Sequence, residues 1–196
     1  MVLYFLIHTV CPVSALASGE SRILYSRGFE PESGDARDLT PEQRRLLQKE
    51  KLQVVARQVR SAVALNREAS SRVGVECVLG EEAAALVEAD SGVFSLGSAE
   101  LFPERSVVLW LGVQALGFSL VCRAFENLLL AESVLRSIAR HCLEELRLLG
   151  PGAEVLLKND RVDALLHRLL PHGQLLFLNH RFALSLEKEM ANYGSK

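Results

Sequence analysis

Cysteine is scarce in this sequence, and its spacing fits neither a redox pair nor a metal site. The four cysteines form no CxxC pair and no finger-like pattern: Cys11, Cys77, Cys122 and Cys142. Three of them lie within apolar segments, where a reduced cysteine packs as a small hydrophobic residue. We therefore expect buried thiols rather than disulfides or metal ligands.

Long apolar runs and an excess of one charge are also missing. The longest apolar stretch, residues 107–122, is interrupted by Gln114 and Ser119 and is shorter than the roughly 20 residues that span a membrane. The chain has 22 Lys and Arg against 24 Asp and Glu, so it offers no general attraction for nucleic acid. Because 49% of its residues are hydrophobic, we expect a single folded domain over residues 1–196, with surface that a partner covers.

The first twenty residues, MVLYFLIHTVCPVSALASGE, admit two interpretations. The apolar run at residues 2–10 and the small residues before Ser18 are similar to a secretory signal peptide, but no Lys or Arg precedes Arg22. Residues 21–26 form a second β-prone run that would pair with the first in an antiparallel hairpin. Because cleavage after Ala17 would leave that strand without its neighbour, we predict that residues 2–10 are retained as a strand.

Catalytic and phosphate-binding motifs are absent from the sequence. His167 and His172 are five residues apart and separated by Pro171, so they do not share a helical face as HExxH ligands do. Ser95 is not part of a G-x-S-x-G elbow, and neither G-x-G-x-x-G nor GxxxxGK(S/T) occurs. We expect surface or core histidines, and a protein that is not an enzyme and has no cofactor and no metal.

A strong helix start follows a predicted surface loop at residues 29–39. In Thr40-Pro41-Glu42-Gln43, Thr40 is placed as the N-cap and Gln43 as the N3 residue of a capping box, and apolar spacing continues the helix to about Arg67. The other face of this helix carries six basic residues: Arg44, Arg45, Lys49, Lys51, Arg57 and Arg60. This basic stripe is either a contact for acidic lipid or an acidic partner, or a solvated face, and we favour the solvated face.

The strands of the second half follow a stretch without periodicity. Residues 69–90, which include the acidic pair 81–82, are predicted to form a variable loop. Residues 93–96, 106–113 and 116–125 are then β-prone, and the last two runs are nearly continuously apolar. Such runs are typical of central strands that are covered on both faces, so helices must lie on both sides of the sheet.

Two helices and a short C-terminal helix complete the predicted order. Asn127 is the expected N-cap of a helix whose apolar stripe includes Ile138. Asn159 or Asp160 is the expected cap of the next helix, which ends at residues 171–173. The last helix is predicted from an apolar stripe of three residues: Phe182, Leu186 and Met190. Segregated strands and helices of this kind predict an α+β fold with an antiparallel sheet.

The arrangement of two strands, a helix, three strands and two helices resembles the longin-like small subunits of adaptor-protein coats. Seven segments in shared order resemble, more narrowly, the sigma subunit of the fifth adaptor-protein complex: residues 5–9 (FLIHT), 23–26 (ILYS), 54–59 (VVARQV), 108–113 (VLWLGV), 116–118 (LGF), 126–132 (ENLLLAE) and 170–179 (LPHGQLLFLN). The resemblance fails in residues 12–19, 29–39 and 69–90. It implies a longin-like, five-stranded antiparallel sheet with helices on both faces.

The resemblance also implies a function and partners. It implies a non-enzymatic subunit of a heterotetramer with two large adaptins, zeta and beta, and a medium mu chain, with spatacsin and spastizin as associated proteins. Its place would be the cytoplasm, peripherally on late endosome and lysosome membranes, in vesicle-mediated protein transport. The alternative from another class is a longin-type scaffold subunit of a GTPase-regulating or tethering complex.

Two residues are candidates for contact with cargo or partner. In better-known adaptors, sigma subunits help to bind acidic dileucine signals through a basic residue at the start of the second strand and an aliphatic residue on the helix after the last strand. By position these resemble Arg22 and Ile138. The simpler interpretations are an exposed edge arginine and a core isoleucine, and we favour them.

Overall fold

The computed structural model describes most of the chain, in ranges separated by short gaps. The described residues are 1–11, 20–29, 40–70, 82–97, 101–102, 104–144, 158–177, 185 and 188. They form ten elements in chain order: β1 (Val2–Thr9), β2 (Ile23–Gly28), α1 (Pro41–Ala69), α2 (Glu82–Val87), β3 (Asp90–Leu96), β4 (Ser106–Val113), β5 (Leu116–Arg123), α3 (Leu128–Glu144), α5 (Asn159–Leu169) and the 3₁₀ turn η2 (Pro171–Gly173). The predicted two-then-three arrangement of strands is therefore confirmed.

The five strands form one antiparallel sheet in the order β2-β1-β5-β4-β3. The N-terminal run lies inside this sheet, because β1 pairs with β2 on one side and with β5 on the other. All of β4 is buried, and β5 is buried up to Arg123. The prediction of a strand at the N-terminus and of two central strands is confirmed. The remaining strands, β2 and β3, form the two edges of the sheet.

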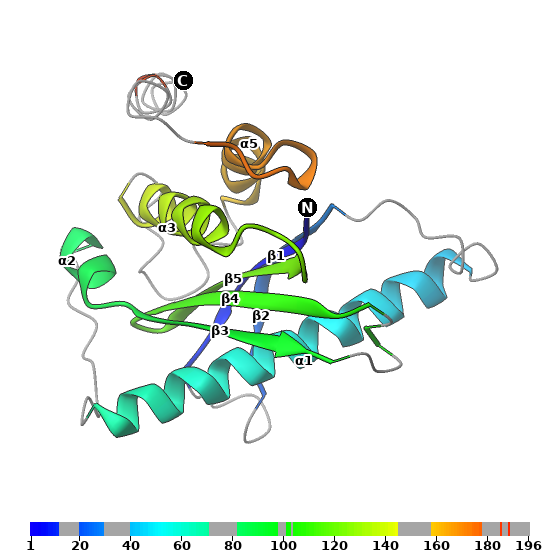
Figure 1. The fold of residues 1–196 in the computed structure, drawn as a ribbon, viewed down its shortest axis with the longest axis horizontal. Coiled ribbons are helices and arrows are strands. Elements are labelled where there is room, and N and C mark those ends of the chain that lie inside the picture. Colours follow the sequence, from blue (N-terminus) through cyan, green and yellow to red (C-terminus); the bar gives the residue numbers. More distant parts are fainter. Residues whose placement is uncertain are drawn as a thin grey trace.

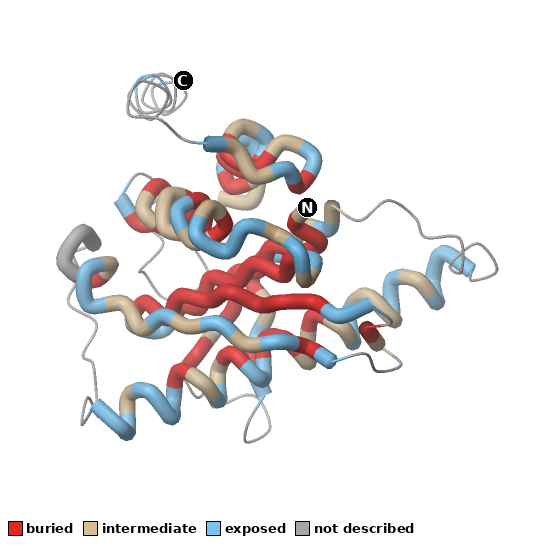
Figure 2. Tube along the Cα trace, in the orientation of Figure 1, coloured by how far each residue is buried: buried red, intermediate tan, exposed pale blue. Residues whose placement is uncertain are grey.

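Helices cover both faces of the sheet, as predicted for a longin-like α+β fold (Figure 1). On one face α1 packs through Leu52, Val55, Val59 and Val63 against side chains of β1 and β4. On the other face α3 packs against β4 and β5, and α5 packs in turn against α3. Figure 2 shows the buried residues gathered in the central strands and on the inner sides of these helices.

The start of α1 has the predicted capping box. The Gln43 N–H donates to Thr40 Oγ1 at 3.3 Å, and the Thr40 N–H donates to Gln43 Oε1 at 2.9 Å. These reciprocal bonds satisfy two of the backbone donors that a helix start leaves free. The helix continues two residues beyond the predicted end, to Ala69.

The predicted loop over residues 69–90 is wrong in its last part. Residues 82–87 form α2, and β3 already begins at Asp90. The element α2 has six residues, so it is too short to show helical periodicity. It forms because Ala85 and Leu86 pack into the core beside α3. Glu82 therefore lies in a helix rather than in a loop.

Further boundaries differ from the predictions, including the end of β5, which lies at Arg123 rather than at Phe125. The second strand begins at Ile23 rather than residue 21, because the pairing register shifts between Ile7 and His8 and frees Ser21 for a side-chain contact. The N-cap of α5 is Lys158, without a side-chain cap bond, rather than Asn159 or Asp160. Asp160 lies in the first turn, where its negative charge interacts favourably with the positive end of the helix dipole.

Several predictions lie outside the described residues. These are Cys77, Glu81, most of the loop at 29–39, residues 71–81, and the C-terminal helix with Phe182, Leu186 and Met190. By contrast, Asn127 is confirmed as a cap, since its Oδ1 accepts from the Leu130 N–H at 3.1 Å.

The LPHG segment ends α5 with two residues in the left-handed region. His172 has φ 52° and Gly173 has φ 74°. A Cβ on Gly173 would lie 2.6 Å from the Val2 carbonyl oxygen and 2.6 Å from the Phe29 Cβ. Glycine is therefore required here both for its conformation and for the close approach to β1.

Candidate partner-binding surfaces

His8 lies near the end of β1, buried in a hydrogen-bonded network rather than at a reactive site. Its Nε2 lies 3.0 Å from Ser119 Oγ, and its Nδ1 lies 3.1 Å from Ser21 Oγ. Ser21 Oγ donates its proton to the Thr9 carbonyl at 2.5 Å, so it accepts from Nδ1–H, and Nε2 accepts from Ser119. The ring is accommodated because Gly117, opposite on β5, has no Cβ to meet it.

This network holds His8 as the neutral imidazole. Burial lowers the pKa of His8 to about 4, and the hydrogen bond with the Thr9 carbonyl opposes this only in part. A neutral histidine with every ring nitrogen bonded has no capacity left for metal binding or proton transfer. The expectation of a core histidine is confirmed for His8.

Arg67 joins three elements in a cluster that sequence reasoning missed. Its Nε donates to Asp90 Oδ2 at 2.9 Å, and its Nη2 donates to the Gln114 carbonyl at 2.7 Å. Both charged side chains are largely buried, with 16% of Arg67 and 10% of Asp90 exposed. Gln114 itself turns the β4–β5 hairpin with φ 50°. The ion pair therefore fixes the end of α1 to β3 and to this turn.

The edge strand β2 and the helix α5 are joined through Asp163, which lies on α5. Tyr25 donates to Asp163 Oδ1 at 2.5 Å, and Arg27 Nη1 donates to the same oxygen at 2.9 Å. Burial, and then the hydrogen bond to Asp163, raise the pKa of Tyr25 well above its ordinary value. Tyr25 therefore stays protonated and acts as a structural donor.

A groove between β2 and α1 contains Arg22. It has a volume of about 780 Å³ and is lined by ten residues: Glu20, Ser21, Arg22, Ile23, Ser26, Arg45, Gln48, Lys49, Leu52 and Gln53. Arg22 is exposed, and its neighbours in the groove include two more cations and one carboxylate. The Gln53 amide donates to the Ser21 carbonyl at 2.9 Å and fixes the strand start against α1. The groove presents a net positive surface with an apolar floor at Leu52.

The basic stripe of α1 does not act as one surface. Arg45 and Lys49 face this groove. Arg60 donates to the Glu20 carbonyl, and Lys51 lies over the Phe102 ring at 5.9 Å from its centroid. Arg57 is exposed on the helix. The predicted solvated face therefore describes only part of the stripe.

Ile138 does not line this groove but packs in the core. It is fully buried on α3, in the core cluster on the face of the sheet opposite to α1. The structure therefore does not bring Ile138 and Arg22 together. Within this chain, Ile138 is a core residue and Arg22 is a surface residue.

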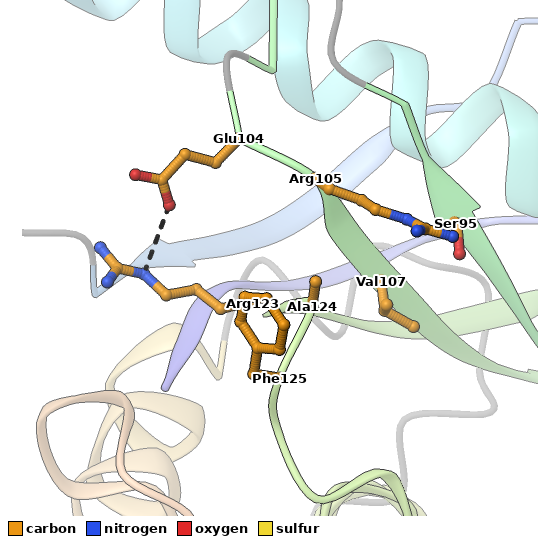
Figure 3. Close-up of a pocket in the computed structure, with 7 residues that line it drawn as sticks. All are labelled: Ser95, Glu104, Arg105, Val107, Arg123, Ala124 and Phe125. Atoms are coloured by element: carbon orange, nitrogen blue, oxygen red, sulfur yellow. Dashed lines mark ion pairs between the residues drawn. The ribbon is translucent and has the colours of Figure 1, made fainter.

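A pocket lies where β3, β4 and β5 reach the turn into α3 (Figure 3). It has a volume of about 680 Å³ and is lined by seven residues: Ser95, Glu104, Arg105, Val107, Arg123, Ala124 and Phe125. The Phe125 side chain is completely exposed on the turn. Arg123 Nε lies 4.0 Å from Glu104 Oε2. This pocket, like the groove, has cations beside an apolar surface.

Metal-ligating and reactive groups do not gather in the parts of the chain that the structure describes. There is no set of three or more His, Cys, Asp or Glu there that could hold a metal. Within these residues, Cys11, Cys122 and Cys142 form no disulfide bond, and burial raises the pKa of Cys122 to about 12. Within the same residues, no helix has the length and apolar character needed to cross a bilayer.

Comparison with known proteins decides between the possible families. The family described as "AP-5 complex subunit sigma-1" matches residues 1–191. The human AP-5 complex subunit sigma-1 is 46% identical over 195 residues, which cover 97% of this chain and 98% of the human protein. The chain belongs to the AP-5 complex subunit sigma-1 family. The mouse protein of the same name is 43% identical over 156 residues, covering 78% of this chain and 92% of the mouse protein.

Membership of the AP-5 sigma-1 family confirms the resemblance seen in the sequence. The segments that carried it have physical roles in the fold. The FLIHT run places His8 in the sheet, the VLWLGV run forms most of β4, and the LPHG segment closes α5 against β1.

Proposed function

We propose that this AP-5 sigma-1 family member is the non-enzymatic small subunit of a heterotetrameric adaptor complex. Its partners are the large zeta and beta adaptins and the medium mu chain, with spatacsin and spastizin as associated proteins. It acts in vesicle-mediated transport at late endosomes and lysosomes, held peripherally on the membrane through the complex, and it stabilises the trunk of a large adaptin. The observation that carries the proposal is the family match over almost the whole chain.

The surface of the chain supports a role in assembly. Among the residues that the structure describes, eight large apolar side chains are exposed, which favours contact with a covering partner: Leu46, Leu65, Val87, Val93, Phe125, Leu128, Leu129 and Phe177. These residues are spread over both helical layers and the β3 edge. An obligate subunit interface buries apolar surface of this kind.

Affinity purification from cells tests the proposal. We expect the tagged chain to recover the zeta, beta and mu subunits in equal amounts, as identified by mass spectrometry. Recovery of a small GTPase and its regulators without adaptins would instead support the tethering-complex alternative. Recovery of neither group would contradict the proposal.

A second proposal concerns the groove that contains Arg22. We propose that its cations contact the acidic residue of a sorting signal, with the apolar part of the signal bound elsewhere in the complex. The groove suits this because Arg22, Arg45 and Lys49 outnumber Glu20 among its charged lining residues.

The assembled complex carrying Arg22→Glu tests the groove. We expect its affinity for an acidic dileucine peptide to fall at least fivefold in a fluorescence-anisotropy titration. Arg57→Glu makes the same charge change at an exposed position of α1 outside the groove lining, so it is the matched control. Equal peptide affinities for the two variants would exclude a role for Arg22.

A further inference from the structure

Among the described residues, the edge strand β3 keeps exposed side chains on the face where α3 lies. Along β3 the exposed side chains alternate, so Ser91, Val93 and Ser95 point to the same face. The helix α3 packs against β4 and β5, and it reaches β3 through a 3.4 Å contact between Arg136 Nη2 and Ser91 Oγ. Val93 is 56% exposed. The sheet therefore has an open corner near the start of α3.

Apolar side chains around this corner are exposed in the part of the chain that the structure describes. Phe125 is fully exposed on the turn between β5 and α3, and Leu129, in the first turn of α3, is 82% exposed. Phe125 lines the pocket of about 680 Å³ together with Val107 and Ala124. An exposed phenylalanine is costly in water, so a partner that covers it gains apolar burial.

Cations lie on either side of this apolar strip. In Figure 3, Arg105 extends towards Ser95 of β3, whereas Arg123 lies on the other side of Ala124 and Phe125 and points towards Glu104. Arg105 is exposed and makes no ion pair within the described residues. Arg123 pairs with Glu104 at a long distance of 4.0 Å. The neighbouring Glu126 carboxylate is paired with the N-terminal ammonium, so it does not neutralise either arginine.

We propose that this corner binds an extended, acidic segment of another subunit of the same complex, with an apolar side chain covering Phe125 and a carboxylate pairing with Arg105. The inference rests on the proposed function, since it takes the neighbouring chain from the adaptor assembly. A protein segment fits better than a membrane because the surface is concave, and its two arginines line it together with Glu104 rather than forming a uniformly basic face.

Site-specific photo-crosslinking in the assembled complex tests the proposal. Benzoylphenylalanine replaces Phe125, and the matched control carries it in place of Leu65, an exposed apolar residue on the opposite face of the sheet. We expect the crosslink from position 125 to map to a peptide of another subunit that contains Asp or Glu beside an apolar residue. A crosslink to a second copy of this chain, to lipid in added phosphatidylserine vesicles, or to nothing would overturn the proposal.

Charge reversal tests the role of Arg105. In the complex that carries the crosslinker at position 125, Arg105→Glu lowers the crosslink yield at least fivefold, whereas Arg57→Glu leaves it unchanged. An unchanged yield in the Arg105→Glu complex would exclude the carboxylate contact.

The proposed adaptor function and the proposed docking corner fail in different ways. If the tagged wild-type chain recovers no adaptor subunits, the proposed function fails. If it recovers them, but position 125 gives no crosslink to another subunit, the complex stands and only the docking corner is wrong. Thermal unfolding of each variant complex, compared with wild type, verifies that the chain remains folded.

Discussion

At the scale of single residues, this sheet depends on side chains that satisfy polar groups in its interior. His8 is the clearest case. Its Nε2 bonds to Ser119, far away in the sequence, and its Nδ1 bonds to Ser21, across a β-bulge. The sequence pattern predicted a buried strand, but a pairing with Ser119, 111 residues away, has no local signal. The tautomer follows from the Ser21–Thr9 bond and could be assigned only from the structure.

Acidification should destabilise the fold through His8. The folded-state pKa is about 4, below the value of about 6.5 for an unfolded histidine. Between these values the unfolded chain binds more protons, so the free energy of unfolding decreases as the pH falls from 6.5 to 4, by about 3 kcal/mol in total. Above pH 6.5 and below pH 4 this group adds no pH dependence.

Urea unfolding of the purified chain between pH 4 and 7.5 measures this effect. His8→Gln should be less stable at pH 7 but should lack the His8 component of the pH dependence. The control is His167→Gln, which removes an exposed imidazole and keeps the wild-type slope. Equal slopes for wild type and His8→Gln would contradict the assignment.

Two glycines of the β3 region should differ in their tolerance of alanine. A Cβ on Gly92 would lie 2.5 Å from Cζ2 of Trp110, whereas a Cβ on Gly97 would meet nothing within 4 Å. We expect Gly92→Ala to cost about 1–3 kcal/mol of stability through overpacking, and Gly97→Ala to change it by less than about 0.5 kcal/mol. Trp110 is the single tryptophan, so its fluorescence emission should shift only in Gly92→Ala. Identical emission spectra for the two variants would refute the contact.

At the scale of elements, the sequence predicted those parts of the fold that have a local chemical signal. The capping box at Thr40 and the Asn127 cap are such signals, and both helices begin where they indicate. The helix α2 was missed because six residues give no periodicity, and its formation depends on packing beside α3. The start of β2 was misplaced because the β-bulge at His8 depends on the partner strand.

The end of α1 depends on an ion pair between elements. We expect Arg67→Ala to lower the free energy of unfolding by about 3 kcal/mol, because it leaves the largely buried Asp90 carboxylate without its partner. A double-mutant cycle with Asp90→Asn should give a coupling energy of about 1–2 kcal/mol. Arg57→Ala, an exposed control on the same helix, should change stability by less than about 0.5 kcal/mol. Additive effects of Arg67→Ala and Asp90→Asn would show that the pair does not stabilise the fold.

At the scale of the whole molecule, the two residues that the family resemblance marked lie in different environments. Arg22 was predictable as a surface residue from its place at a strand start, and Ile138 as a core residue from the apolar stripe of α3. The groove around Arg22 and the corner at Phe125 were not predictable, because each joins residues from separate elements. Surfaces of this kind arise from topology rather than from any one segment.

Ile138→Asp should therefore impair folding, whereas Arg22→Glu should leave folding nearly unchanged. An aspartate at the fully buried position 138 places an unpaired charge in the core, and we expect the chain to lose cooperative unfolding. Arg22→Glu is an exposed change and should alter the melting temperature by less than about 2 °C. Circular dichroism during heating measures both variants. A cooperative transition in Ile138→Asp would mean that this part of the core is open to solvent.

We infer, as proposed above, that the exposed apolar surface of this small adaptor subunit is completed by a large adaptin. Co-expression with the zeta subunit, followed by size-exclusion chromatography with light scattering, tests it most directly. We predict a single species with the mass of one copy of each chain. Elution of the chain as a separate monomer, with no zeta subunit in its peak, would rule out this contact with the large adaptin.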